Sequence, residues 1–190
     1  MPRAGVRSAA AKILDLLAGG ASSSYFGEAV TQLDHALQAA DLARRSGADD
    51  ETVIAALLHD VGHLLEHEPS RVSQVGVVDH DVLGSEFLQQ RGFSSRVVRL
   101  VRGHVAAKRY LTATNPSYYE RLSEASKCTL ALQGGPMSSA EVADFERSEL
   151  RSELLRLRAW DEQAKVPGAS AAPLEDYRPL IHAHLTRSIL

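Results

Sequence analysis

The sequence predicts an all-α fold, and three observations support that prediction. Apolar residues recur at the three- and four-residue spacing of a helix face, as in the stripe His80, Leu83, Gly84, Phe87 and Leu88. Glycine and proline separate these stretches, and no alternation typical of a strand persists between them. With 190 residues, 44% of them apolar, the chain is long enough to bury one core.

The first half of the chain divides into four expected helices, each with a recognisable end. Gly19-Gly20 ends the first and Ser46-Gly47 ends the second. Asp49 or Asp50 caps the third, which we expect to fade near Glu66 to Pro69. A loop from Pro69 to Gly76 follows, and such a loop could cover a site. The helices are expected at about residues 6–18, 29–45, 50–66 and 79–91.

The second half predicts four more helices. The fifth begins near Ser94, and Ser117 to Glu120 has the form of a capping box for a sixth that reaches Thr129. After the break at Gly134-Gly135-Pro136, Ser138 and Glu141 form a second capping box, which opens a long seventh helix. We expect a loop over residues 166–173 and a terminal helix over 174–190, bent or started at Pro179.

Composition excludes several classes of protein. A net charge of −3 provides no basic surface for nucleic acid or an anionic membrane, and no stretch is apolar enough to span a bilayer. The single cysteine, Cys128, excludes an internal disulfide and is expected to be a buried, inert thiol. Lys12 and Asp15 interrupt an amino-terminal stretch that could be mistaken for a signal peptide. We expect a cytoplasmic protein, and no obligate protein partner is evident.

A histidine and an aspartate stand side by side within the apolar run Ala55-Ala56-Leu57-Leu58-His59-Asp60-Val61-Gly62-His63. Burying an imidazole and a carboxylate costs several kcal/mol unless something pairs with them. A metal ion suits both ligand types. This stretch is therefore the first candidate for a metal site.

Further ligands stand on the inward stripes of other expected helices. One buried imidazole is usually a silent core residue, but four on separate apolar stripes indicate a shared cluster. Asp161, on the seventh helix, adds a second carboxylate. Six nitrogen and oxygen ligands exceed the needs of one tetrahedral ion, so we predict two metals bridged by Asp60. The predicted ligands are His35, His59, Asp60, His80, His104 and Asp161.

The pattern His35…His59-Asp60…Asp161 resembles the HD-domain superfamily, and His80 and His104 match its dinuclear members. Almost the whole chain is similar to the PhnZ-like HD-domain oxygenases of phosphonate degradation. The similarity is most specific in Gly103-His104-Val105-Ala106-Ala107-Lys108-Arg109-Tyr110-Leu111, and it includes residues 25–32, 45–49, 133–137 and 158–161. It implies one HD domain over residues 1–190, with a metal-binding core at about 29–161 and a carboxy-terminal loop and helix at 166–190.

The resemblance implies a mixed-valent Fe(II)/Fe(III) pair that uses O2 to cleave the carbon–phosphorus bond of an α-hydroxyphosphonate. The implied substrates are (R)-2-amino-1-hydroxyethylphosphonate, which would give glycine, and its N-trimethylated analogue, which would give glycine betaine. Phosphate is the other product. The residues themselves do not choose between the two amines. No catalytic residue beyond the metal ligands is assigned.

Several further side chains are candidate substrate contacts. Lys108 lies one turn beyond His104 and could reach an anion at the metals. The resemblance places phosphonate contacts at His63, Lys108 and Ser126, with Arg158 as a further candidate or a support for Asp161. Tyr25 and Glu28 pair an aromatic ring with a carboxylate, which suits a cationic group. The resemblance implies that these two residues sense the amine and that the tyrosine occupies an iron site until substrate binds.

Two other functions use the same ligands. A dinuclear HD phosphohydrolase would act on a nucleotide or phosphomonoester through a bridging hydroxide. A non-catalytic ligand-sensing module would keep the fold without turnover. The motif from Val105 to Leu111, with Tyr25 and Glu28, favours the oxygenase over the phosphohydrolase. The presence of all six predicted metal ligands disfavours the sensing module.

Overall fold

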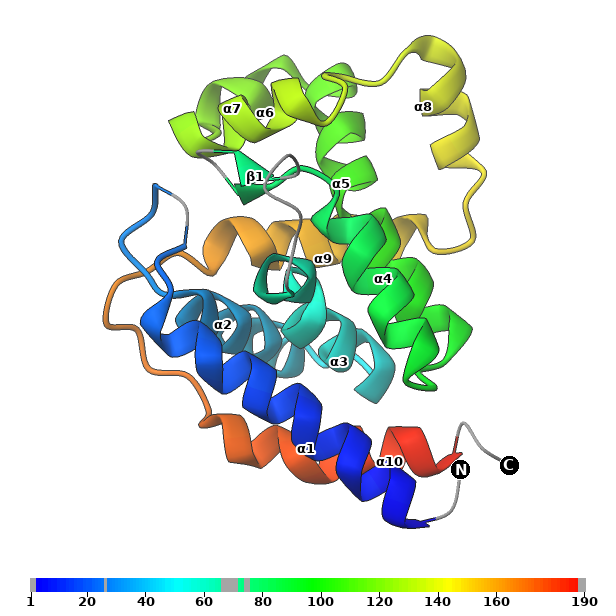
Figure 1. The fold of residues 1–190 in the computed structure, drawn as a ribbon. Coiled ribbons are helices and arrows are strands. Elements are labelled where there is room, and N and C mark those ends of the chain that lie inside the picture. Colours follow the sequence, from blue (N-terminus) through cyan, green and yellow to red (C-terminus); the bar gives the residue numbers. More distant parts are fainter. Residues whose placement is uncertain (1–2, 26, 66–71, 74–75, 188–190) are drawn as a thin grey trace.

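The structure is a computed structural model that describes residues 3–25, 27–65, 72–73 and 76–187. Helices dominate these ranges, so the predicted all-α fold is confirmed (Figure 1). None of the described helices is both long and apolar enough to cross a membrane. The elements are α1 (Arg3–Gly19), η1 (Gly20–Ser22), α2 (Gln32–Arg45), α3 (Asp50–Leu58), η2 (Val61–Leu64), β1 (Val72–Ser73), β2 (Gly76–Val77), α4 (His80–Gln90), α5 (Ser95–Thr114), α6 (Pro116–Arg121), α7 (Glu124–Leu132), α8 (Ser139–Glu146), α9 (Arg151–Gln163), η4 (Leu174–Tyr177) and α10 (Arg178–Arg187).

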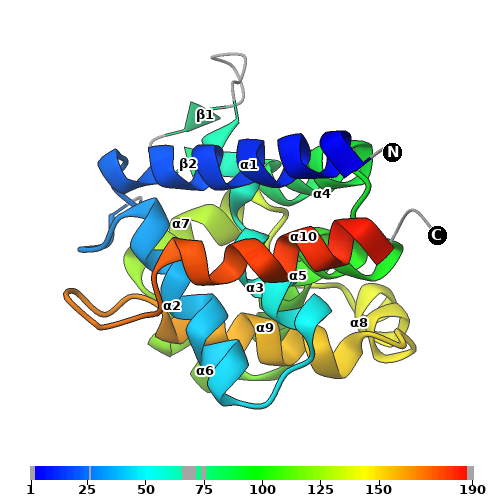
Figure 2. The ribbon, with the colours of Figure 1, turned by 90° about the horizontal axis from the view of Figure 1, so that it is seen from below.

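The helices α2, α3, α5 and α9 pack against one another and form the centre of the molecule. Their contacts include fully buried leucine and isoleucine side chains, each of which contributes about 1.5–3 kcal/mol on burial; examples are Ile54, Leu58, Leu100 and Leu157. The first and last helices, α1 and α10, lie side by side and cover the outer side of α2 and α3 (Figures 1 and 2). The centre is thus closed on one side by the two ends of the chain.

The third helix is shorter than predicted. α3 ends at Leu58, and His59 and Asp60 lie in the turn between α3 and the 3-10 helix η2. The chain leaves the α-helix here because η2 packs closely on the start of α4, at Gly62. The predicted end near Glu66 to Pro69 lies outside the described residues. Within the predicted 69–76 loop, β1 and β2 form a short antiparallel hairpin instead.

The predicted sixth helix is wrong, since two helices replace it. The backbone adopts an extended conformation at Leu122, and Ser123 caps α7 by accepting a hydrogen bond from the Ser126 amide. Ser117 forms no capping box at the start of α6. The break lets α6 bring Tyr118 over α9, where its hydroxyl accepts a 2.7 Å hydrogen bond from Arg158 Nε, while α7 turns towards the interior.

The predicted seventh helix is also divided. The capping box of Ser138 and Glu141 is present at the start of α8, but the chain leaves the helix at Arg147 and resumes at Arg151. An unbroken helix from Ser139 to Gln163 would be about 37 Å long. The break allows α9 to lie against α2 and α5 while α8 stays on the surface.

Smaller differences concern helix ends and one side chain. α2 begins at Gln32 rather than near Ala29, because Thr31 and Asp34 form a capping box there. The terminal segment folds as η4 followed by α10, with Pro179 in the first turn of α10, where proline is tolerated. Cys128 is exposed, so its prediction as a buried thiol is wrong. It lies on the outward face of α7, whose inward face carries Ser126 and Leu130.

Candidate metal centre

Four buried histidines converge between the central helices. His35 lies on α2, His59 directly after α3, His80 at the start of α4 and His104 within α5. None is more than 5% exposed. Each Nδ1 atom lies 2.7–3.0 Å from a backbone carbonyl oxygen, in the pairs His35–Ala164, His59–Ala56, His80–Val77 and His104–Val101. A carbonyl only accepts, so Nδ1 of each ring carries a proton and Nε2 is the atom that would bind a metal ion.

The four Nε2 atoms meet in two facing pairs. Those of His35 and His59 lie 3.1 Å apart, and those of His80 and His104 lie 3.0 Å apart. When both rings of a pair are neutral, their Nε2 atoms have no hydrogen to share and their lone pairs repel. A cation placed beside each pair removes that repulsion. The arrangement is therefore typical of imidazoles that bind metal ions through Nε2.

Asp60 lies between the two pairs and directs one carboxylate oxygen to each. Oδ2 lies 3.5 Å from His35 Nε2 and 3.4 Å from His59 Nε2. Oδ1 lies 3.3 Å from His80 Nε2 and 3.4 Å from His104 Nε2. A carboxylate held in this way has the geometry of a ligand that bridges two ions.

Asp161 completes the pair formed by His35 and His59. Its Oδ1 lies 3.4 Å from His35 Nε2, is buried and accepts no hydrogen bond. Its other oxygen, Oδ2, is held by the Arg158 guanidinium one turn earlier on α9. The ion pair with Arg158 thus fixes Oδ2, whereas the buried Oδ1 lacks the hydrogen-bond partner or metal ion that a buried carboxylate oxygen requires.

These donors fit metal ions in both number and spacing. Ligand atoms about 2.1 Å from a common ion, at tetrahedral or octahedral angles, lie about 3.0–3.4 Å apart, close to the distances above. Among the described residues, two groups of His and Asp have ligand atoms within 4.8 Å of one another, namely His35 with His59 and Asp60, and Asp60 with His63 and His80. The second group includes His63, which the sequence predicts as a substrate contact. The residues present can therefore hold metal.

Both carboxylates are ionised despite their burial. Burial opposes ionisation of Asp60, but the surrounding imidazoles, His59 foremost, hold the pKa of its carboxyl well below the usual range. Burial likewise opposes ionisation of Asp161, and the Arg158 guanidinium keeps the pKa of that carboxyl well below its usual range. Both groups are therefore ready to act as anionic ligands.

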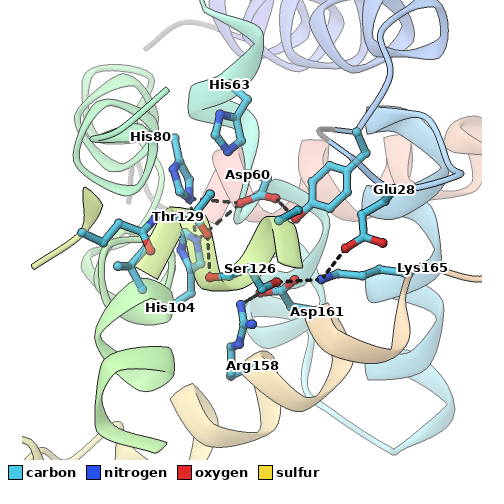
Figure 3. A pocket seen from close by; sticks show the side chains of 14 residues that line it. Glu28, Asp60, His63, His80, His104, Ser126, Thr129, Arg158, Asp161 and Lys165 are labelled. Carbon is cyan, nitrogen blue, oxygen red and sulfur yellow. Dashed lines mark hydrogen bonds and ion pairs between the residues drawn. The ribbon is translucent and has the colours of Figure 1, made fainter. Parts of the chain in front are cut away.

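A cavity of about 50 Å³ opens beside these ligands (Figure 3). Asp60, His80, His104 and Asp161 form its metal-facing wall. Five of the six predicted substrate contacts line the rest of it, namely Tyr25, Glu28, His63, Ser126 and Arg158. The structure thus brings together, in one small space, the metal ligands and most of the residues expected to contact substrate.

Tyr25 and Glu28 reach the cavity from one tight turn before α2. The Glu28 amide donates to the Tyr25 carbonyl oxygen at 2.8 Å, and Gly27 has a φ of +74°, which favours glycine. The Tyr25 ring stacks on His35 at 4.0 Å, and its hydroxyl donates a 2.9 Å hydrogen bond to Asp60 Oδ2. Burial, and then the negative charge of Asp60, raise the pKa of Tyr25 well above 10. The phenol therefore keeps its proton.

Lys108 lies deeper than the sequence predicts. It is only 4% exposed and does not line the cavity, and its ammonium group donates a 2.9 Å hydrogen bond to Thr129 Oγ1, which does. Burial, followed by the positive charge of Arg158, lowers the pKa of Lys108 to about 7. Its positive charge therefore acts on the cavity from behind Thr129.

Three polar residues that line the cavity escaped the prediction: Thr129, Gln133 and Lys165. Thr129 and Gln133 follow Ser126 on the same face of α7, so their spacing from Ser126 could have identified them. Lys165 follows the end of α9, and only the packing of that segment on α2 brings its side chain inward. No local pattern in the sequence indicates that contact.

Comparison with known proteins agrees with this site. The HD domain family model matches residues 33–132. The chain is 41% identical over 167 residues to the hydroxymethylphosphonate dioxygenase of Gimesia maris, covering 87% of this chain and 83% of that protein. It is 42% identical over 159 residues to the glycine-betaine-forming [1-hydroxy-2-(trimethylamino)ethyl]phosphonate dioxygenase of Leisingera caerulea, covering 83% and 80%. An uncharacterized protein of Acanthamoeba polyphaga mimivirus is 37% identical over 178 residues, covering 93% and 81%.

The resemblance predicted from the sequence motifs is thus confirmed over most of the chain. The family model begins just before His35 and includes the His59-Asp60 pair, His80 and His104. The two dioxygenases extend the similarity beyond that domain model. The chain belongs to the HD-domain family and, within it, to the PhnZ-like oxygenases.

Proposed function

We propose that the protein is an oxygenase that uses O2 to cleave the carbon–phosphorus bond of an α-hydroxyphosphonate, with release of phosphate and a carboxylic acid. The reaction balances without a further reductant, because RCH(OH)PO3H2 and O2 contain the atoms of RCOOH and H3PO4. The proposal rests on the two pairs of imidazoles with Asp60 between them, in a chain that is similar to two phosphonate dioxygenases. Candidate substrates are 2-amino-1-hydroxyethylphosphonate and its N-trimethylated analogue.

The proposed cofactor is a mixed-valent pair of iron ions. His35, His59, Asp60 and Asp161 would hold one ion, and Asp60, His80 and His104 the other. An all-nitrogen and oxygen donor set without thiolate suits iron in an oxygenase. When bound, the pair would supply the activation of O2 and the acceptance of electrons from the carbinol carbon.

The phosphonate end of the substrate has several candidate partners. The first turn of α7 lines the cavity with Ala125 and Ser126, and a helix amino terminus favours anions. Thr129 and His63 add further polar atoms to the same wall. Lys108 supplies positive charge through Thr129. These residues would orient the phosphonate so that the carbinol group faces Asp60 and the metals.

The opposite wall suits a cationic group. Glu28 and the ring of Tyr25 lie together there, and one oxygen of Glu28 is buried without a hydrogen-bond partner. Because the Tyr25 hydroxyl bonds to the Asp60 oxygen that faces His35 and His59, this side chain would cover the ion proposed to bind there. We propose that substrate binding moves the tyrosine away, so that O2 is activated only when substrate is present.

The decisive experiment measures O2 consumption and phosphate release by the iron-loaded protein with both candidate α-hydroxyphosphonates. We expect one O2 consumed for each phosphate released, and no phosphate without O2. Phosphate release that continues under anaerobic conditions, or release from phosphomonoesters instead, would establish a dinuclear hydrolase and overturn the proposal.

Lys108→Met tests the proposed phosphonate wall. The substitution keeps the buried aliphatic stem and removes the charge, so KM for the hydroxyphosphonate is expected to rise about 10- to 100-fold, as for a hydrogen bond to a charged group. Steady-state kinetics measures the effect. Unchanged kinetic constants would show that the anion binds elsewhere.

The same lysine predicts a pH dependence. Because its pKa is lowered to about 7, the amine of the free protein is charged below pH 7 and ready to pair with the phosphonate. Above pH 7 it is neutral, and binding the anion then requires proton uptake. We expect kcat/KM to fall as the pH rises through about 7. In Lys108→Met this fall of kcat/KM should disappear, so that only the ionisation of the substrate affects the pH profile. Identical pH profiles of kcat/KM in the wild-type protein and the variant would show that Lys108 is not the titrating group.

A further inference from the structure

Lys165 is held in place by its neighbours on both sides. The carbonyl oxygen of Ala164 accepts a 2.8 Å hydrogen bond from His35 Nδ1. The amide and carbonyl groups of Val166 both bond to the side chain of Gln38, at 3.1 and 3.0 Å. Three hydrogen bonds to α2 thus fix the backbone around Lys165 immediately after α9 ends. The direction of this side chain is therefore set by the core rather than by solvent.

The ammonium group of Lys165 lies inside the cavity, between two residues proposed to contact opposite ends of the substrate (Figure 3). It donates a 3.2 Å hydrogen bond to Ser126 Oγ and forms a looser 3.4 Å ion pair with Glu28 Oε1. It also lies 5.9 Å from the centre of the Tyr25 ring. The side chain is only 13% exposed, so little solvent weakens these contacts.

The contact with Glu28 is the weaker of the two. Its length exceeds that of a charge-assisted hydrogen bond, about 2.7–2.9 Å, and Glu28 Oε1 is buried without any hydrogen bond. A buried carboxylate oxygen without a hydrogen bond is stabilised by a donor that approaches it to normal hydrogen-bond distance. Glu28 and Tyr25 both line the cavity, so a donor group of a bound ligand could reach this oxygen.

We propose that Lys165 is the internal counter-ion of Glu28 and determines substrate specificity, because the cationic group of the substrate must displace it. This inference rests on the proposed function and names the substrate class as an α-hydroxyphosphonate with a cationic amine. Without substrate, Lys165 keeps the Glu28 carboxylate paired. When the amine binds Glu28, Lys165 retains its bond to Ser126 and loses only the looser contact. The lysine therefore competes with the substrate amine and limits how strongly the site prefers cations.

The test uses two probes that lack the oxidisable hydroxyl and differ only in the amine, 2-aminoethylphosphonate and ethylphosphonate. Calorimetric titration of the metal-loaded protein gives the ratio of their dissociation constants, which measures the preference for the cation. Removing the competitor in Lys165→Met is expected to raise that preference about tenfold, a change of about 1.4 kcal/mol. Lys165→Arg should stay near the wild-type preference, and Glu28→Gln should bring the ratio close to one.

The double variant Lys165→Met/Glu28→Gln completes the cycle. Its ratio should also be close to one, because the effect of Lys165 is exerted through Glu28. An unchanged or lower preference in Lys165→Met overturns the proposal, and so does a gain that persists in the double variant. Since binding of the probes involves no turnover, the titrations can show that a cationic amine displaces Lys165 from Glu28 even if hydroxyphosphonates prove not to be oxidised. Failure of the wild-type protein to bind either probe would reject the proposed role of Lys165, whereas the proposed function is tested separately by O2-dependent phosphate release.

Discussion

Replacing His104 with alanine is expected to yield a folded protein that holds one iron ion instead of two and has lost turnover. The substitution removes the 3.0 Å contact of the imidazole with His80 Nε2 and its 3.4 Å contact with Asp60 Oδ1, while all four predicted ligands of the first ion remain. Loss of a residue that only orients a metal ligand lowers metal affinity or activity about 10- to 100-fold. Loss of the ligand itself should therefore lower kcat more than about 100-fold.

Iron content per chain and kcat measure this effect together. His182→Ala provides a matched control, since His182 lies on α10, on the far side of α2 and α3, and is not among the cavity residues. We expect the control to retain two irons and wild-type turnover. Full activity of His104→Ala with a single iron would show that the second ion is not required.

Replacing Gly62 with alanine is expected to destabilise the fold and the metal centre together. A Cβ atom at this position would lie 1.9 Å from the carbonyl oxygen of His80 and 2.7 Å from its carbonyl carbon. These are backbone atoms that cannot rotate away, so η2 and the start of α4 must separate. Overpacking of this kind costs about 3 kcal/mol, or about 10 °C in Tm for a chain of this size. Asp60 and His80 would move with the two elements.

Thermal unfolding and iron content check this expectation. Gly19→Ala is the matched control, because no atom lies within 4 Å of a Cβ atom built there and the residue ends α1. That control should leave Tm and iron content unchanged. Equal behaviour of the two variants would show that the close contact between Gly62 and His80 is not required. The contact explains why glycine follows the His59-Asp60 pair so closely.

The metal-facing groups could be predicted from the sequence because each imidazole interrupts an otherwise apolar helix face. His35 and His104 follow this rule directly, since their positions depend only on helical periodicity within α2 and α5. His59 and Asp60 lie just after α3, yet their place beside a buried helix was sufficient to bring them inward.

The remainder depends on how segments pack, which local patterns do not encode. Leu122 breaks the predicted sixth helix because α6 and α7 cover different neighbours, and Ser123 is an ordinary serine until it caps α7. Lys165 resembles any lysine after a helix until Gln38 fixes the chain beside it. The depth of Lys108 likewise reflects where α7 places Thr129. Long-range contacts, rather than local helix propensity, determine the conformation and burial of these residues.

Anomalous X-ray diffraction at the iron absorption edge, from crystals of the iron-loaded protein, tests the dinuclear site most directly. We expect two peaks about 3.5–4 Å apart, one beside His35, His59 and Asp161 and the other beside His80 and His104, with Asp60 between them. A single peak, or iron bound away from Asp60, would contradict this expectation.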